Sequence, residues 1–187
     1  MRPERLQGLR LSIVAGGREL AAVKLITRGD GNLSARIDEG KFIVTPTGRD
    51  KGKLKTDDLF EIEINSHRAP EGASTEVGLH RAIYARFPSI HAVVHAHPQK
   101  VLALADEGLA PDPKLLPNGG TVLDRVSWIE DFPPGSRSLA EEVALGIARA
   151  PALVIAAHGA VTVGATVDQA VIRMIRLERL ALLTRGR

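Results

Sequence analysis

Hydrophobic and polar residues follow two different periods along the chain. Apolar residues three or four positions apart predict helices over 4–26, 74–87, 138–149 and 167–183. Alternating or continuously apolar runs between turn residues predict strands over 29–37, 41–45, 59–64, 89–97 and 151–164, the last being two strands that meet at His158 and Gly159. Hairpin strands mixed with helices favour an α/β fold, with a mixed, largely antiparallel sheet and helices on both faces.

Local signals refine the helix boundaries. Gly16 and Gly17 interrupt the first helical pattern, and we expect them to loosen or bend that helix. The second helix opens with the hydroxyl residues Ser74 and Thr75 as caps, which places Glu76 in its first turn. A short helix is expected after Pro98, a weak strand or loop over 126–132, and a loop over the Pro- and Gly-rich stretch 108–120.

Composition limits the function classes. With 187 residues and 44% hydrophobic content, the chain fits one domain spanning 1–187. A net charge of only +3, with interspersed charges and 3% aromatic residues, argues against nucleic-acid binding. No apolar run approaches a membrane span or a signal peptide, so we expect a cytoplasmic protein. Because cysteine is absent, a metal site would have to use histidine and carboxylate ligands.

His95 and His97 stand one residue apart at the end of a predicted strand. Side chains two positions apart project from the same face of a strand, so both imidazoles can reach one metal ion. Taken alone, this pair is more typical of two hydrogen-bonded histidines. His158 ends another apolar strand, and three such histidines favour an open metal site, with zinc first and manganese or cobalt as alternatives.

The start of the helix over 74–87 offers a second kind of site. Free backbone N–H groups and the hydroxyls of Ser74 and Thr75 could bind an anion, although an ordinary capped helix explains the same residues. His80 lies one turn after Glu76, where we expect a packed, hydrogen-bonded histidine. Lys51 and Lys53 are expected to be solvated on the surface.

Five motifs occur in order along the chain: GNLS (31–34), TPTG (45–48), EGASTE (71–76), HAHP (95–98) and AHGAVTVG (157–164). Together they resemble the class II aldolase/adducin family, from the first helix to the last, and most closely its branch that acts on L-fuculose 1-phosphate. The resemblance implies a three-layer α/β/α sandwich and a homotetramer with active sites at subunit interfaces. Motif by motif it implies zinc ligands at His95, His97 and His158, an acid/base at Glu76, and contacts to the substrate phosphate from Gly31, Asn32, Thr47, Gly48, Ser74 and Thr75.

The chemistry that the resemblance implies is cleavage of a ketose 1-phosphate to dihydroxyacetone phosphate and a short aldehyde, through an enediolate that the metal stabilises. Aldolases of this kind also use a tyrosine from a neighbouring subunit and another in a C-terminal tail. The single tyrosine of this chain, Tyr84, lies in a predicted helix and matches neither.

Several alternatives therefore stay open. Within the family these are a sugar-phosphate 4-epimerase, a methylthioribulose-1-phosphate dehydratase and a sugar-acid phosphate decarboxylase. Glu rather than Asp at position 76 modestly favours the aldolase over the epimerase. A non-catalytic adducin-like scaffold would not need the three histidines, and a cupin-type barrel is opposed by the long helical patterns.

Overall fold

The computed structural model describes residues 3–116 and 123–186, and the predicted loop over 108–120 therefore lies partly outside the described residues. Within them, seven strands form one sheet in the order β3-β2-β1-β4-β7-β6-β5. Neighbouring strands are antiparallel except for the parallel pair β5 and β6, which confirms the mixed, largely antiparallel sheet. The strands are β1 (Asn32–Arg36), β2 (Lys41–Val44), β3 (Phe60–Glu63), β4 (Ala92–Ala96), β5 (Ser127–Ile129), β6 (Ala152–Ile155) and β7 (Gly159–Gly164).

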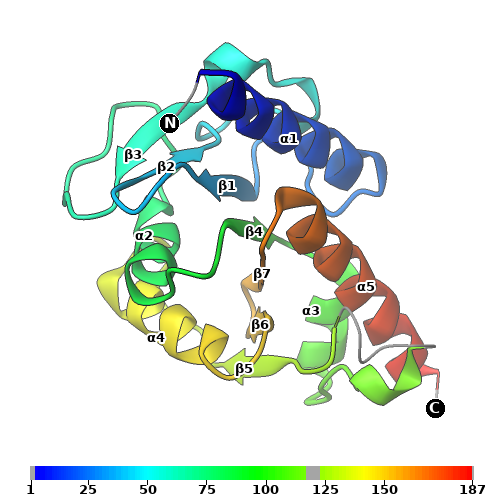
Figure 1. Ribbon diagram of the computed structural model, residues 1–187. Helices are drawn as coiled ribbons and strands as arrows, with labels where there is room; N and C mark the ends of the chain where they lie inside the picture. The colour runs from blue at the N-terminus through cyan, green and yellow to red at the C-terminus, as the bar shows by residue number, and fades with distance from the viewer. Residues whose placement is uncertain (1–2, 117–122, 187) are drawn as a thin grey trace.

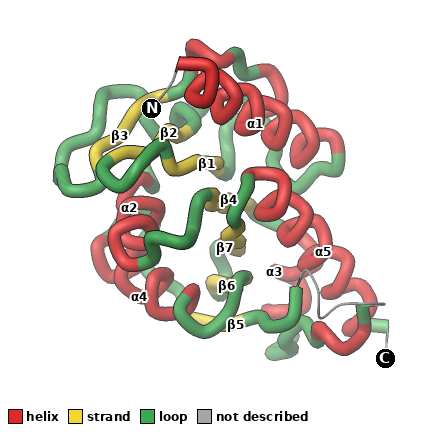
Figure 2. Tube along the Cα trace, viewed as in Figure 1, coloured by secondary structure: helices red, strands yellow, loops and turns green. Residues whose placement is uncertain are grey.

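Helices cover both faces of this sheet, so the fold is the expected three-layer α/β/α sandwich (Figures 1 and 2). One core cluster packs one face against α1, α3 and α5, and a second cluster packs the other face against α2 and α4. The helices are α1 (Pro3–Ala22), α2 (Val77–Arg86), α3 (Gln99–Asp106), α4 (Arg137–Ile147) and α5 (Val167–Arg185), with short 3₁₀ helices over Lys51–Lys53, Thr56–Asp58 and Pro113–Leu115.

The central strand β4 is buried on both sides, which explains its continuously apolar sequence. Its side chains alternate between the two clusters: Val94 packs with the α1/α5 side and Val93 with the α2/α4 side. His95 has the same parity as Val93. The predicted histidine pair therefore projects toward α2, at the end of β4.

Two predictions about helices were wrong. Helix α1 continues through Gly16 and Gly17, because these glycines permit close packing. A Cβ at Gly17 would lie 2.5 Å from the backbone oxygen of Lys51, and one at Gly16 would lie 3.0 Å from a methyl of Val171 in α5. Helix α2 begins at Val77, so Ser74 and Thr75 precede it and Glu76 is its N-terminal capping residue. In the described part of the chain, no helix is long and apolar enough to cross a membrane.

Candidate active site

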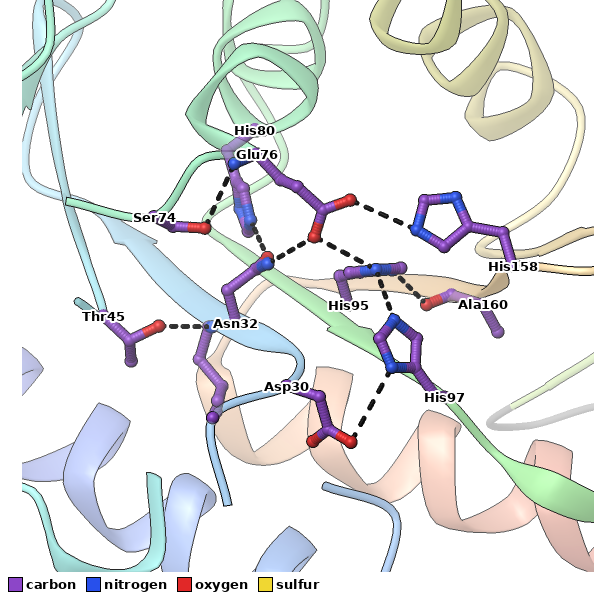
Figure 3. A network of polar contacts seen from close by, with 12 residues as sticks. Asp30, Asn32, Thr45, Ser74, Glu76, His80, His95, His97, His158 and Ala160 are labelled. Atoms are coloured by element: carbon purple, nitrogen blue, oxygen red, sulfur yellow. Dashed lines mark hydrogen bonds and ion pairs between the residues drawn. The ribbon is translucent and has the colours of Figure 1, made fainter. Parts of the chain in front are cut away.

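The three predicted metal-ligand histidines converge at one point, beside the ends of β4 and β7 (Figure 3). His95 lies within β4, His97 directly follows it, and His158 is in the turn before β7. Antiparallel pairing of Ala96 with Ala160 brings these segments together. One ring nitrogen from each histidine lies within 4.8 Å of the other two, and the Nε2 atoms of His95 and His97 are 3.2 Å apart.

Hydrogen bonds and burial favour cation binding by these imidazoles. The Nδ1–H of His95 donates to the backbone oxygen of Ala160 at 3.0 Å, which leaves a lone pair on Nε2 facing the common point. Burial, and next the neighbouring His95, lowers the pKa of the His97 imidazole to about 4, so this ring is neutral at pH 7. Its Nδ1 lies 3.8 Å from a carboxylate oxygen of Asp30. Three imidazoles whose ring nitrogens face one point fit a divalent metal ion of the zinc, manganese or cobalt type.

Glu76 faces the same point from the start of α2. Its Oε2 lies 3.2 Å from Nε2 of His95, and its Oε1 lies 3.3 Å from Nε2 of His158. The side-chain amide of Asn32 donates to Oε2 at 2.8 Å. Asn32 is directly opposite His95 in the pairing of β1 with β4, which explains why it reaches the carboxylate.

These contacts determine the charge of Glu76. Burial by itself raises the pKa of its carboxyl, but the imidazoles of His158 and His95, which lie next to its two oxygens, and the amide of Asn32 outweigh burial. The net result is a pKa well below the usual range. Glu76 is therefore an ionised carboxylate at pH 7 and a proton acceptor.

A pocket of about 440 Å³ opens above this centre. Eight of the ten site residues that the sequence predicts line it: Gly31, Asn32, Thr47, Ser74, Thr75, Glu76, His97 and His158. His95 is completely buried beneath it, in contact with Glu76. Gly48 is next to the lining residue Thr47, and its backbone packs against Gly29 of the neighbouring loop. The structure therefore brings three separate loops, around residues 31, 47 and 74, to one cavity.

Backbone geometry explains part of this loop arrangement. Gly31 has φ +63°, and a Cβ there would lie 2.8 Å from the backbone oxygen of His95, so only glycine fits. The hydroxyl of Ser74 accepts a hydrogen bond from the backbone N–H of Glu76 at 3.2 Å. Both ends of the Asn32 amide are already engaged, one with Glu76 and the other with His80. The assignment of these loops to a substrate phosphate stays a prediction.

Three further residues near the site were not predicted to take part in it, and one of them, Lys51, differs from its prediction. Lys51 was expected to be solvated but is 1% exposed, and its ammonium donates to the backbone oxygen of Gly29 at 2.8 Å. Burial lowers its pKa, and the negative charges of Asp30 and Asp50 oppose that effect. Asp131, which belongs to none of the sequence motifs, also lines the pocket. Tyr84 lies in α2, as expected, and is not among the residues that line this pocket.

The chain is similar to known proteins in sequence. The family model for the class II aldolase and adducin N-terminal domain matches residues 12–184. A methylthioribulose-1-phosphate dehydratase from Pectobacterium carotovorum is 34% identical over 154 residues, covering 75% of each chain. A 3-oxo-tetronate 4-phosphate decarboxylase from Pectobacterium atrosepticum is 31% identical over 182 residues, covering 95% of this chain and 84% of the relative.

A solved structure agrees with both the fold and the sequence match. The L-fuculose-1-phosphate aldolase from Thermus thermophilus superposes with a TM-score of 0.86 and 31% identity, covering 99% of this chain and 95% of that one. Together with the family model, which spans nearly all of the chain, this result confirms the resemblance read from the five motifs. The chain belongs to the class II aldolase and adducin family.

Proposed function

We propose that this protein is a metal-dependent class II aldolase that cleaves a ketose 1-phosphate similar to L-fuculose 1-phosphate into dihydroxyacetone phosphate and a short aldehyde. The observation that carries the proposal is the convergence of the Glu76 carboxylate and three imidazoles at one wall of the pocket. The similarity over nearly the full length to an L-fuculose-1-phosphate aldolase supports this substrate class.

His95, His97 and His158 would hold the cation, and zinc is our first choice because three histidines are a frequent ligand set of catalytic zinc. The bound ion would supply a Lewis acid that stabilises negative charge on the carbonyl oxygen of the substrate. Two buried polar atoms support a metal ion at this point. Oε1 of Glu76 and Nδ1 of His158 have no hydrogen-bond partner among the described residues, and buried polar atoms normally have one.

Glu76 would move the proton. Because its carboxyl is ionised, it begins as a base: in the condensation direction it removes a proton from the hydroxymethyl carbon next to the carbonyl of dihydroxyacetone phosphate. In the cleavage direction the same group returns that proton to the carbon after the C–C bond has broken. The loops that contain Gly31, Thr47 and Ser74 would hold the phosphate and align the bond to be broken.

Two other reactions of the family have specific support. The dehydratase and decarboxylase relatives are as similar to this chain, at 34% and 31% identity, as the solved aldolase at 31%. Both reactions also develop negative charge beside a carbonyl group, so the same metal and carboxylate could serve them. An assay of the products separates the three reactions.

The experiment uses protein stripped with a chelator and reloaded with zinc, manganese or cobalt. Each form is incubated with L-fuculose 1-phosphate and other ketose phosphates, with methylthioribulose 1-phosphate, and with 3-oxo-tetronate 4-phosphate. Metal-dependent release of dihydroxyacetone phosphate supports the aldolase. Release of water or carbon dioxide from the other substrates, without dihydroxyacetone phosphate, replaces it with the dehydratase or decarboxylase, and absence of both metal and activity indicates the adducin-like scaffold.

We also propose a cytoplasmic homotetramer with the phosphorylated sugar bound at subunit interfaces, as the family resemblance implies. Light scattering tests the assembly, since a tetramer has four times the chain mass of 20.0 kDa. A monomer that is active at the same specific rate would contradict the interfacial sites.

A further inference from the structure

A buried chain of hydrogen bonds leads away from Glu76, underneath the pocket. The amide of Asn32 donates to Oε2 of Glu76 at 2.8 Å, and its oxygen contacts Nε2 of His80 (Figure 3). On the other side of the His80 ring, Nδ1 lies 2.6 Å from the hydroxyl of Ser34. That hydroxyl lies 2.8 Å from the hydroxyl of Tyr84. Four side chains therefore follow one another behind the carboxylate.

Matching periods of a strand and a helix produce this chain. Asn32 and Ser34 are two residues apart in β1 and project from the same face of the sheet. Glu76, His80 and Tyr84 are spaced four apart at the start of α2 and along it, so they lie on one face of the helix. Two positions of a strand and one turn of a helix cover similar distances, which lets the two rows interleave.

The directions of the hydrogen bonds follow from the carboxylate. An ionised carboxylate only accepts, so the NH₂ group of Asn32 points to Glu76 and its oxygen points to His80. His80 must then donate from Nε2, and its Nδ1 accepts from Ser34. Burial lowers the pKa of His80 to about 3, so the ring is neutral and has one donor and one acceptor, as this order requires. Ser34 in turn accepts from Tyr84.

We propose that His80 is a positioning residue that fixes the Asn32 amide and, through it, the orientation of the Glu76 carboxylate. Asn32 holds Oε2, whereas Oε1 has no hydrogen-bond donor among the residues that the structure describes and becomes the atom that exchanges a proton with substrate. Tyr84 supplies the last donor of the chain, which gives the single tyrosine a place behind the site. The inference rests on the proposed role of Glu76 as acid/base.

Two variants of His80 separate positioning from packing. In His80→Gln the amide nitrogen reaches close to the position of Nε2 and can still donate to Asn32. In His80→Asn the shorter amide overlaps the position of Nδ1 and does not reach Asn32. We expect His80→Asn to lower kcat by roughly 100-fold, the loss typical of a misplaced catalytic group, with little change in KM or metal content. His80→Gln should retain most of the wild-type kcat.

Equal kcat losses in the two variants would assign His80 to packing alone and overturn the proposal, as would a wild-type kcat in His80→Asn. A second readout needs no substrate: ¹⁵N NMR of histidine-labelled protein reports which ring nitrogen of His80 carries the proton. We expect Nε2–H, and a proton on Nδ1 would overturn the proposal even if the protein is inactive toward every sugar phosphate assayed. If Nε2–H is observed in a protein without such activity, the hydrogen-bond chain stands and only the acid/base role of Glu76 fails.

Discussion

Gly159 lies directly against the imidazole of His97, at the point where β7 begins beside the end of β4. A Cβ built on Gly159 would be 2.7 Å from Cδ2 of His97, 3.0 Å from Cε1 of His95 and 2.6 Å from the backbone oxygen of Ala96. The first and third of these contacts are too short for a real Cβ, so the His97 ring or the Ala96 backbone would have to move, and the His95 ring would have to shift by a few tenths of an ångström. The absence of a side chain at this glycine is therefore part of what places two of the three histidines.

Gly159→Ala should displace both rings and lose most of the bound metal, while overpacking lowers the free energy of unfolding by about 1–3 kcal/mol. Metal content after dialysis and chemical denaturation measure the two effects. Gly8→Ala is the matched control, because a Cβ at that exposed helical position meets no atom within 4 Å. Full metal occupancy in Gly159→Ala would show that the rings tolerate the methyl group.

Glu76→Gln should abolish most turnover and leave metal bound. Glutamine keeps the size of the side chain but cannot accept the proton, and a general acid/base contributes roughly 10²–10⁴-fold to a rate. Activity and metal analysis of the same sample provide the measurement, and His95→Ala should lose both. Glu71→Gln changes an exposed glutamate in the same loop and should behave as wild type. Normal activity in Glu76→Gln would contradict the mechanism.

Lys51→Met should raise KM for the phosphorylated substrate more than it changes kcat. The Lys51 ammonium donates to the carbonyl of Gly29, so it holds the loop that carries Gly31 at the pocket wall. Lys53→Met is the control, because that side chain is 84% exposed and pairs only with Asp50 among the contacts described for it. An equal rise in KM in both variants would show that general positive charge, and not the buried contact, matters for phosphate. A wild-type KM in Lys51→Met would contradict the prediction.

The histidine site could be predicted from sequence because it depends on local regularities. Two-residue alternation along β4 places His95 and His97 on one side, and that rule holds for any strand. The convergence of His158 followed from its place at the end of another apolar strand, once the five motifs indicated one fold. The order and pairing of the strands that bring His158 close to the other two histidines could not be predicted, because they are properties of the assembled sheet.

The features that cannot be predicted from the sequence depend on contacts between distant segments. The pattern around Gly16 and Gly17 predicts a bend, but packing of α1 against Lys51 and α5 requires glycine in a regular helix. Burial of Lys51 follows from the same close approach. The spacing of Glu76, His80 and Tyr84 by four residues was a usable signal for the buried chain, but its partners in β1 appear only when the helix is docked.

The pH dependence of stability tests the buried state of His80. Its pKa falls from 6.5 to about 3 on folding, through burial first and the neighbouring His95 second, against the opposing charge of Glu76. Between these values the unfolded chain binds a proton that the folded chain does not. The contribution of His80 to stability is therefore complete above pH 6.5 and is lost as the pH falls toward 3, by about 1.4 kcal/mol per pH unit.

Denaturant unfolding of chelator-treated wild type and His80→Gln at about pH 4 to 7 isolates this effect, because the two proteins share all other titrating groups. The wild type should lose stability relative to the variant as the pH is lowered, and parallel curves would mean that His80 takes up a proton in the folded protein.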